Sequence, residues 1–373
     1  MKKIGILGGG QLGRMLLQAA INYPVEMHVL ENDPNCPAAG FCQYFSKGDI
    51  TNYDDVVEFG KNLDAITIEI EQVNTDALNK LEEMGVVVFP KASIITTIKN
   101  KIQQKQFFVQ HQIPTSPFIT TQTNADIAAH PNLLPGVHKL AMGGYDGRGV
   151  QVIQSLTDIG KGFPGPAVLE KMVTIKQEIS QLIAIDQNGK YTYYPTVDMV
   201  FDTSLNMLSY QICPANLPKH VQEQISTIAV KVAKSLNSPG VFAIEFFVND
   251  QDEVLVNEIA PRVHNSGHHT IEASYSSQFD MLLRIILGYP LGSTENRTNA
   301  ALINLIGASG YNGTPIYRGI EKALNIENVF VHIYGKSNTK PGRKMGHITI
   351  TDNDIKSLKE KVKEIKNIIS VEA

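Results

Sequence analysis

Short apolar runs alternate with stretches of helical periodicity over residues 3–90. Strand-like runs stand at 3–7, 27–30, 65–70 and 86–89, and the segments between them are long enough for helices. Strands that alternate with helices are typical of a parallel sheet covered by helices. We therefore predict a small parallel α/β unit at the start of the chain.

The pattern changes near residue 98, where we place the start of a second unit. Residues 94–112 predict one helix rich in Lys and Gln, and residues 115–290 are rich in strands and hairpins separated by Gly and Pro. Within that stretch, residues 222–236 predict a core helix with one apolar stripe. A third region begins near residue 298 and closes on an amphipathic helix. Its predicted strands are 301–305, 330–334 and 347–350, and the apolar face of its helix carries Ile355, Leu358, Val362 and Ile365.

Composition and charge exclude several classes of protein. The 373 residues are 43% hydrophobic and 19% charged, with a formal net charge of −4. This balance argues against a polybasic protein that binds nucleic acid, and no run approaches the roughly 18 apolar residues of a membrane span. The N-terminus leads into the first strand without the apolar core of a secretory signal. Cys36, Cys42 and Cys213 show no paired spacing, so we expect free thiols in a cytoplasmic protein. From the charge and the apolar runs we expect neither membrane nor nucleic-acid partners.

A glycine-rich turn follows the first predicted strand. Residues 8–13 read Gly-Gly-Gly-Gln-Leu-Gly, which fits G-x-G-x-x-G, and Glu31 lies near the end of the second strand. Together they match a dinucleotide fingerprint. The same glycines also suit any phosphate site or a closely packed helix start, so the pattern alone leaves both interpretations open.

Two carboxylates stand inside neighbouring apolar strands, 241–248 and 253–259, with turn residues between them. If residues 249–252 form the turn, Val248 faces Glu253, and Glu245 and Glu258 become diagonal neighbours on one face, about 7–8 Å apart. Buried carboxylates so placed repel unless a cation lies between them. Oxygen ligands without thiolates favour Mg²⁺, or Mn²⁺, shared with phosphate oxygens. The alternative is an acidic pair on an outward-facing sheet edge.

Three histidines follow these strands, at positions 264, 268 and 269. His264 and His268 have the spacing of a helical zinc pair, but Pro261 and Gly267 bracket the segment and argue against a helix. Donors to an anionic ligand are the better interpretation. We expect them from Arg262, His264 and Asn265.

A second glycine-rich loop spans residues 143–149 and follows Lys139. Its glycines allow backbone N–H groups to turn toward phosphate, and Lys139 supplies a mobile positive charge. A plain glycine-rich hairpin is the alternative. Residues 167–173 then predict a strand that could offer backbone groups to an adenine edge, and Glu178 could accept hydrogen bonds from ribose hydroxyls.

These motifs together resemble the ATP-grasp ligases, and among them the 5-(carboxyamino)imidazole ribonucleotide synthase family of purine biosynthesis. The resemblance runs from residue 3 to about residue 351. It is carried by the stretches 8–15, 143–149, 257–268 and 342–347. It implies an α/β fold (α+β overall), with a Rossmann-like pre-ATP-grasp domain (1–97), an ATP-grasp domain (98–297) and a small C-terminal domain (298–373).

The resemblance also implies an activity. ATP and bicarbonate would form carboxyphosphate, which carboxylates the amine of aminoimidazole ribonucleotide and leaves ADP and phosphate. It further implies a homodimer. Two alternatives stay open: a nucleotide-binding sensor without turnover, and an ATP-grasp ligase for another acceptor.

The resemblance assigns roles to individual residues. ATP phosphates would meet Lys101, Lys139, Gly143, Gly144, Tyr145, Asp146, Gly147, Arg148 and Gly149. The adenosine site would comprise Glu170, Lys171, Met172, Val173 and Glu178, and the metal and phosphate site Glu245, Asn257 and Glu258. The acceptor and bicarbonate would meet Tyr145, Asp146, Arg148, Arg262, His264 and Asn265, with Lys336 and Arg343 on the ribonucleotide phosphate. Glu71 would face the same site from a strand end.

Three positions depart from the family pattern. Asn100-Lys101 stands where Asp-Arg is common, so the charge is kept and the bidentate fork is lost. Met142 replaces a usual threonine or aromatic residue before the paired glycines. Met199-Val200-Phe201 replaces an Asn-x-His, which weakens the expected ATP contacts at the edge of the site.

Overall fold

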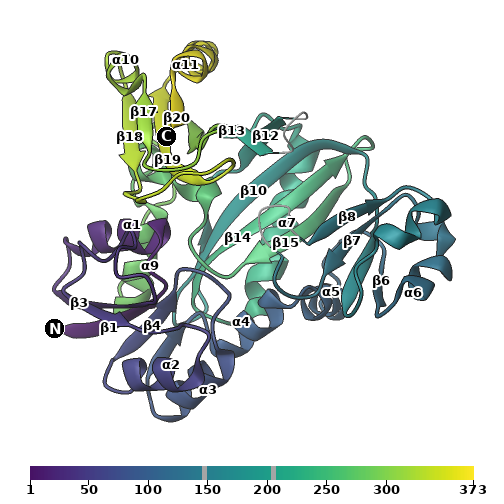
Figure 1. The fold of residues 1–373 in the computed structure, drawn as a ribbon, viewed down its shortest axis with the longest axis horizontal. Helices are drawn as coiled ribbons and strands as arrows, with labels where there is room; N and C mark the ends of the chain where they lie inside the picture. Colours follow the sequence, from purple (N-terminus) through teal and green to yellow (C-terminus); the bar gives the residue numbers. More distant parts are fainter. Residues whose placement is uncertain (145–148, 203–206) are drawn as a thin grey trace.

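The computed structural model describes residues 1–144, 149–202 and 207–373. Figure 1 shows a first sheet with its helices, a large central sheet, a small sheet beside the large one, and C-terminal strands that extend the large sheet. No helix in the described ranges is long and apolar enough to cross a membrane.

The first sheet is parallel throughout and has the order β3-β2-β1-β4-β5, which confirms the predicted α/β unit. Its strands are β1 (Lys2–Leu7), β2 (Val25–Glu31), β3 (Tyr44–Lys47), β4 (Ala65–Ile68) and β5 (Val87–Phe89). Its helices are α1 (Gln11–Ala20), α2 (Tyr53–Gly60), α3 (Thr75–Glu83) and α4 (Ala92–Lys99). The patterning missed β3, because this short edge strand carries no buried residue.

The single helix predicted over 94–112 is wrong. Helix α4 ends at Lys99, and α5 (Lys101–Gln110) begins after Asn100, whose backbone is extended. The Asn100 side chain accepts hydrogen bonds from the backbone N–H groups of Ile102 (3.0 Å) and Gln103 (3.3 Å). An N-cap asparagine therefore divides the helix.

The small sheet is antiparallel, in the order β6-β9-β7-β8. Its strands are β6 (Phe118–Thr121), β7 (Gly136–Leu140), β8 (Val150–Ile153) and β9 (Ala167–Lys171). Helix α6 (Asn124–Ala128) and two 3-10 turns, η1 (Pro131–Leu133) and η2 (Leu156–Lys161), accompany it. The chain crosses to the large sheet through residues 172–174.

The large sheet has the order β15-β14-β10-β12-β13-β16-β19-β18, with β11 paired to β10. Its strands are β10 (Ile175–Ile185), β11 (Tyr191–Tyr193), β12 (Val197–Asp202), β13 (Met207–Cys213), β14 (Gly240–Asn249), β15 (Val254–Ala260), β16 (Asn299–Ile306), β18 (Val329–Ile333) and β19 (Lys344–Asp352). Strand β16 follows the predicted domain boundary at residue 298, and it pairs with β13, which precedes that boundary. One sheet therefore spans both predicted domains, and the three domain bounds stay predictions.

Helices cover the large sheet unequally. Helix α7 (Lys219–Leu236), predicted as 222–236, packs on the apolar face at Ile179, Phe242 and Ile244. The other face carries Glu178, Glu245 and Glu258, and we call it the acid face. It is covered in part by η3 (Asn265–Gly267), α8 (Thr270–Ala273) and α9 (Gln278–Leu287).

The C-terminal region ends differently from the prediction. Leu358, Val362 and Ile365 of α11 (Ile355–Ile368) are buried as expected, but Ile355 is exposed. The chain does not close on this helix, because β20 (Ser370–Glu372) follows and pairs with β17 (Ile316–Arg318). Helix α10 (Ile320–Leu324) lies between β17 and β18 along the chain.

One apolar core joins the first sheet to the large sheet through α9. It includes Leu16 of α1, Val29 of β2, Leu182 of β10 and Leu283 of α9, all buried. Helix α9 thus packs between α1, which covers the first sheet, and strands β10 and β14 of the large sheet.

We predict that Leu283→Ala lowers the free energy of unfolding by about 2–5 kcal/mol, because it opens a cavity in that shared core. Urea-induced unfolding measures the change. Leu324→Ala is the matched control, since Leu324 is 55% exposed and its loss should change stability by about 0.5 kcal/mol or less. Equal effects from the two substitutions would contradict the assigned core.

Candidate active site

Glu245 and Glu258 lie directly opposite one another on β14 and β15, which corrects the predicted diagonal register. Val248 pairs with Val254 and not with Glu253, because the turn extends to Glu253, whose backbone carbonyl accepts from the Asn249 N–H at 3.0 Å. The register then shifts between Glu245 and Phe246, so that β15 has one extra residue. The two carboxylates are closer in register than the sequence predicted.

The extra residue is Asn257, which makes a β-bulge. Phe246 pairs with Val256 and Glu245 pairs with Glu258, so Asn257 has no partner of its own. Without the bulge, strict alternation would place Asn257 and Glu258 on opposite faces. Lys139 Nζ donates to Asn257 Oδ1 at 3.0 Å, and Lys101 Nζ lies 2.6 Å from Glu258 Oε2.

The two acids have different electrostatic surroundings. Burial, and then the neighbouring Glu258, raise the pKa of Glu245. The Lys101 ammonium lowers the pKa of Glu258 against the effect of burial. A further positive charge at Glu245 would allow both carboxylates to ionise.

A ring of polar contacts connects the small sheet to β15 behind this pair. Glu170 Oε2 lies 2.8 Å from Lys105 Nζ, and Glu170 Oε1 lies 3.0 Å from Lys139 Nζ, off the direction of a hydrogen bond. Lys105 also donates to Thr115 Oγ1 at 2.6 Å, and that hydroxyl donates to the Val256 carbonyl at 2.7 Å. The Glu170 carboxylate therefore holds the two lysines.

The charges in this ring are buried. Lys105 and Glu170 each expose about 4% of their side chains. Burial lowers the pKa of Lys105 to about 8, while Lys139 and Lys105 lower the pKa of Glu170 against burial. The carboxylate is thus ionised at neutral pH and depends on both ammonium groups.

The second glycine loop joins β7 to β8, and the backbone closes it where the Leu140 N–H donates to the Gly149 carbonyl at 2.9 Å. Gly143 and Gly149 have positive φ angles of 78° and 73°, so glycine is required there. Met142 is 45% exposed beside the loop. Tyr145, Asp146, Gly147 and Arg148 lie outside the described residues.

The predicted adenosine site falls at the crossover between the two sheets. Strand β9 ends at Lys171, and Met172 and Val173 lead to β10, which carries Glu178. Both backbone groups of Lys171 are engaged, because its N–H donates to the Pro117 carbonyl (2.8 Å) and its carbonyl accepts from Ser116 Oγ (2.5 Å).

The environment of Glu178 is more apolar than the sequence suggested. Glu178 pairs in register with Met199 and Phe247, which share the acid face. Met199 is buried, so an apolar side chain lies at the departed Asn-x-His position. Burial raises the pKa of Glu178 to about 7, and Lys139 opposes this shift.

Arg262 and His264 reach the site from the segment after β15. Arg262 Nε donates to Glu71 Oε2 at 2.6 Å, and the two residues lie on opposite sides of the junction between the sheets. Burial opposes the charged forms of both, but each partner outweighs it, so the pKa of Arg262 is raised and that of Glu71 is lowered. The pair is therefore ionised.

The orientation of the His264 ring follows from its hydrogen bonds. The Ser266 N–H donates to His264 Nδ1 at 3.3 Å, so the ring proton is on Nε2, which lies 3.7 Å from Glu245 Oε1. His268 points elsewhere, because its Nδ1 contacts Gln278 Nε2 at 3.1 Å. The described residues contain no group of three or more His, Cys, Asp or Glu side chains suited to a metal ion, so the zinc hypothesis gains no support.

The first glycine turn encloses an internal carboxylate. Glu69 Oε1 accepts from the Leu12 N–H at 3.1 Å, at the start of α1. A Cβ on Gly10 would come within 2.3 Å of the same oxygen. Gly9 donates its N–H to Glu31 Oε2 at 2.9 Å. The Gly9 and Leu12 N–H groups thus donate to internal carboxylates and are not free for a pyrophosphate, so the dinucleotide interpretation gains no support.

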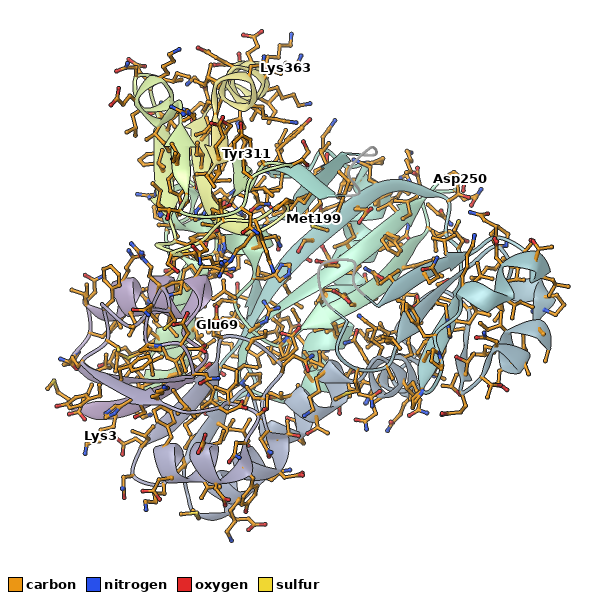
Figure 2. The ribbon with its side chains drawn as sticks, in the orientation of Figure 1. Lys3, Glu69, Met199, Asp250, Tyr311 and Lys363 are labelled. Atoms are coloured by element: carbon orange, nitrogen blue, oxygen red, sulfur yellow. The ribbon has the colours of Figure 1, made fainter. Side chains whose placement is uncertain are left out.

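Glu69 lies where the first sheet meets the large sheet (Figure 2). Burial raises the pKa of Glu69, and Arg262 and Lys336 are among the charges that oppose this shift. The basic loop that carries Lys336 and Arg343 therefore approaches the same region. Lys336 Nζ donates to the Lys344 carbonyl at 2.7 Å, and Arg343 Nη1 donates to the Asn338 carbonyl at 2.7 Å.

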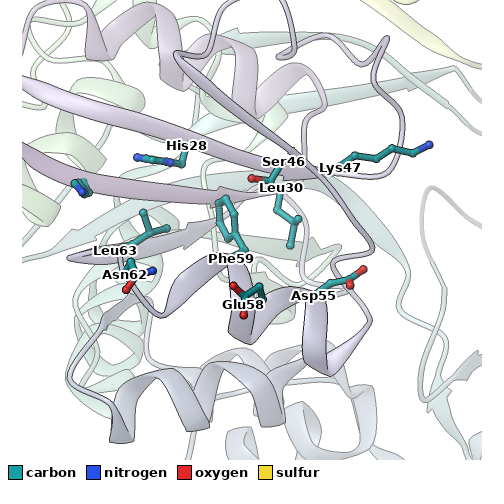
Figure 3. A pocket seen from close by; sticks show the side chains of 10 residues that line it. His28, Leu30, Ser46, Lys47, Asp55, Glu58, Phe59, Asn62 and Leu63 are labelled. Atoms are coloured by element: carbon teal, nitrogen blue, oxygen red, sulfur yellow. The ribbon is translucent and has the colours of Figure 1, made fainter.

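A cavity of about 390 Å³ lies elsewhere, between α2 and strands of the first sheet (Figure 3). Its lining includes Lys3, His28, Ser46, Lys47 and Glu58. None of its lining residues belongs to the large sheet, so it is separate from the acid pair.

Comparison with known proteins gives the family. Residues 1–99 match the ribonucleotide synthetase preATP-grasp domain, residues 106–279 the ATP-grasp domain, and residues 300–361 the phosphoribosylaminoimidazole carboxylase C-terminal domain. The crystal structure of N5-carboxyaminoimidazole ribonucleotide synthetase from Thermotoga maritima is 35% identical, covers 100% of both chains and superposes with a TM-score of 0.93. The chain belongs to the N5-carboxyaminoimidazole ribonucleotide synthases.

Two further relatives differ from this chain in bound ligands or in length. The synthase of Aspergillus clavatus, in complex with ADP and 5-aminoimidazole ribonucleotide, is 31% identical, covers 98% of each chain and has a TM-score of 0.89. The chloroplastic phosphoribosylaminoimidazole carboxylase of Vigna aconitifolia is 35% identical over 95% of this chain. The chain spans only 65% of that relative's length. The middle of the chain thus belongs to the ATP-grasp class.

The sequence interpretation missed several residues of this synthase site. Lys105 and Thr115 complete the ring around Glu170, and Glu69 fills the glycine turn. Arg14 donates from α1 to the Tyr334 carbonyl at 2.9 Å, beside the basic loop. The sequence signal for Lys105 was its position four residues after Lys101, which places both lysines on the same face of a helix. Its burial appears only in the structure.

We predict that Lys105→Met lowers the free energy of unfolding by about 3–5 kcal/mol, because it leaves the buried Glu170 with one ammonium instead of two. The Michaelis constant for ATP should rise as Lys139 is drawn toward Glu170. Urea-induced unfolding and initial-rate kinetics measure the two effects.

The double variant Lys105→Met/Glu170→Gln should recover part of the lost stability, because the unpaired charge is gone. Lys61→Met is the control, since Lys61 pairs with Glu58 on the surface and its loss should cost about 0.5 kcal/mol or less. If the effects of Lys105→Met and Glu170→Gln on stability were additive, that result would contradict the ring of contacts.

We predict a pH-dependent gain in stability for Glu178→Gln. The unfolded carboxyl ionises near its ordinary pKa of 4.5 and the folded one at about 7, so the wild type loses stability as pH rises between these values. The advantage of the glutamine variant should therefore grow from pH 4.5 to about 7 and then level off. Thermal unfolding across this range measures it, and a constant difference would contradict the burial.

Proposed function

We propose that this chain carboxylates 5-aminoimidazole ribonucleotide with bicarbonate and ATP, through carboxyphosphate, to give 5-carboxyaminoimidazole ribonucleotide, ADP and phosphate in purine biosynthesis. The observation that carries the proposal is the direct opposition of Glu245 and Glu258 next to Arg262 and His264. A site for a cation and a site for anions thus lie side by side. The complex of the Aspergillus clavatus synthase with ADP and the ribonucleotide supports both substrates.

The acid pair fits a hard divalent cation. Its donors are carboxylate oxygens, and a bound cation would offset the burial and the Glu258 charge that raise the pKa of Glu245. We assign Mg²⁺, or Mn²⁺, to Glu245 and Glu258, with phosphate oxygens as the remaining ligands. When bound, the cation would withdraw charge from the transferring phosphoryl group.

The protein's own residues would hold the nucleotide. Lys139 and Lys101 are placed to neutralise phosphate charge, and Gly143, Gly144 and Gly149 can turn N–H groups toward it. The crossover at Met172 and Val173 would border the adenine. Glu178 would accept from the ribose hydroxyls, and Glu170 would act through Lys139, which it holds.

The acceptor would lie between the first sheet and the acid face. Arg262, held by Glu71, would bind bicarbonate and stabilise the developing anion, with His264 and Asn265 beside it. Lys336 and Arg343 would bind the ribonucleotide phosphate. Tyr145, Asp146, Gly147 and Arg148 complete the proposed set from outside the described residues.

Closure of the glycine loop over this site would exclude water from carboxyphosphate. We further propose that the chain is a homodimer in the cytoplasm, with domains at 1–97, 98–297 and 298–373. Sedimentation velocity would measure the assembly.

A sensor without turnover remains the second candidate, because Met199 lies beside Glu178 where the family has polar residues. Omitting substrates one at a time separates the two candidates and also tests for another acceptor. A synthase releases ADP rapidly only when bicarbonate and aminoimidazole ribonucleotide are both present, whereas a sensor releases none.

We predict that Glu258→Gln lowers the rate of ADP release by at least about 100-fold at saturating ATP and Mg²⁺, because the cation loses a charged ligand. A coupled assay for ADP measures the rate. Glu253→Gln is the matched control on the same hairpin, where the exposed carboxylate accepts from Asn249 Nδ2 at 2.8 Å. ADP release near the wild-type rate in Glu258→Gln would refute the assigned role.

A further inference from the structure

The acid face continues past the active site into a row of buried polar side chains. Residues paired across antiparallel strands share a face. Met199 pairs with Gln211 on β13, Gln211 pairs with Leu302, and two residues further along β16 Asn304 pairs with His347 on β19. His347 in turn pairs with His332 on β18. One face of the sheet therefore links the site to the C-terminal strands.

The segment after Arg262 covers this row. Gln211 Nε2 donates to the Ser266 carbonyl at 3.0 Å, and the His268 ring stacks on His347 with ring centres 4.8 Å apart. His347 stacks in turn on His332, at 4.4 Å. We define the histidine seam by these stacked rings and the polar residues around them, namely Gln211, Asn265, His268, Asn304, His332, His347 and Thr349.

Many polar atoms of the histidine seam are buried without a hydrogen-bond partner among the described residues. These atoms are Gln211 Oε1, Asn265 Nδ2, His268 Nε2, both amide atoms of Asn304, His347 Nε2 and Thr349 Oγ1. His268, His347 and Thr349 are 0% exposed. Leaving a buried polar atom without a partner is unfavourable, so a set of them in one seam indicates bound polar molecules.

The hydrogen bonds around Gln278 fix one donor in the seam. The His264 N–H donates to Gln278 Oε1 at 2.8 Å, so the other end of that amide is the NH₂ group. This group lies 3.1 Å from His268 Nδ1, which must accept from it. The proton of the neutral His268 ring is therefore on Nε2, and this buried N–H points into the seam.

A metal ion does not fit this geometry. The ring planes of His332 and His347 are 10° apart, and those of His268 and His347 are 30° apart. Lone pairs of stacked rings lie in those planes and cannot converge on one ion. Water suits a mixed set of donors and acceptors, because each buried molecule makes about three hydrogen bonds.

The seam has an inner and an outer end. At the inner end, Asn265 follows His264, whose Nε2 faces Glu245. At the outer end, His332 Nε2 lies 2.7 Å from Glu272 Oε1, and the His332 side chain is 24% exposed. The row therefore runs from the active site to solvent.

We propose that the histidine seam holds a chain of ordered water molecules that carries a proton from the reacting amine to solvent at His332 and Glu272. This inference rests on the proposed function. Carboxylation forms a bond from nitrogen to carbon and breaks an N–H bond, so one proton must leave the amine. It passes to the inner water, a proton leaves the outer water to solvent, and the side chains end unchanged.

The imidazoles orient the water and do not themselves become charged. Burial lowers the pKa of His268 and of His347 well below the ordinary value, and neighbouring histidines lower it further. Neutral rings can donate and accept at once, which suits proton hopping along water. We therefore describe His268 and His347 as positioning residues.

The first test compares two substitutions at His347. His347→Phe keeps a stacked ring and removes both nitrogens, whereas His347→Gln places an amide near the position of Nε2. We expect kcat to fall about 10-fold or more in the phenylalanine variant and to recover in part with glutamine. The ratio of ADP to carboxylated product should rise above that of the wild type, because carboxyphosphate hydrolyses when the amine keeps its proton.

A purely structural role would lower both products together and leave the ratio unchanged, and this outcome would overturn the proposal. His28→Phe is the matched control, because His28 stacks on Tyr44 at 4.5 Å in the first sheet. It should leave the ratio and kcat at wild-type values.

Asn304→Leu serves if the His347 variants do not fold. A dry seam would make this substitution stabilising and leave activity intact, because it removes two unpartnered polar atoms. A hydrated seam predicts a lower kcat without a gain in stability. Stabilisation with wild-type turnover would overturn the proposal.

A crystal structure of the wild-type protein at high resolution gives an independent measurement. We expect water about 2.7–3.2 Å from His268 Nε2, His347 Nε2 and Asn304 Nδ2. Electron density without ordered water at these atoms would overturn the proposal. Failure of the proposed function would differ, since the wild type would then release no ADP with both substrates while the seam remained hydrated.

Discussion

The bulge at Asn257 is the constraint on which the active site depends. One extra residue in β15 brings Asn257 to Lys139 and Glu258 to Lys101, and it sets Glu258 directly opposite Glu245. Two half-buried carboxylates so placed repel one another unless positive charges lie nearby. The surrounding elements supply them: α5 contributes Lys101 and Lys105, and β7 contributes Lys139. The break after α4 places Lys101 at the start of α5, and the small sheet carries Lys139, so both features position these positive charges.

Charge balance also organises the junction with the first sheet. The glycine turn surrounds the carboxylate of Glu69 at the start of α1, and Glu71 pairs with Arg262 across the junction. A helix N-terminus favours a negative group, so the turn binds an internal carboxylate where other proteins bind phosphate. The apolar core around α9 holds the two sheets in place while these polar pairs define the space between them.

The two faces of the large sheet do different work. One face is apolar and packs on α7 and α11, which gives the sheet its stability. The acid face is polar over most of its width, from Glu258 through Glu178 and Gln211 to His347. Because the C-terminal strands continue this sheet, their polar residues share a surface with Glu245 and Glu258, where we propose that the nucleotide binds. The continuity gives the C-terminal region a physical connection to the chemistry.

The sequence by itself determined the parallel first sheet, the presence of two acids on neighbouring strands, the glycines that begin and end the second glycine loop, and the segment after Pro261 that we propose to bind anions. Those features depend on short-range periodicity and on motifs within a few residues, which the sequence displays directly. Only the tertiary structure decided the register of Glu245 against Glu258, the partners of Glu69 and Glu170, and the stacking of three histidines from separate segments. A one-residue bulge reverses which face a side chain occupies, and partners such as Lys105 and Glu170 are far apart in sequence. No local pattern encodes such pairings, because they form only when distant elements pack together.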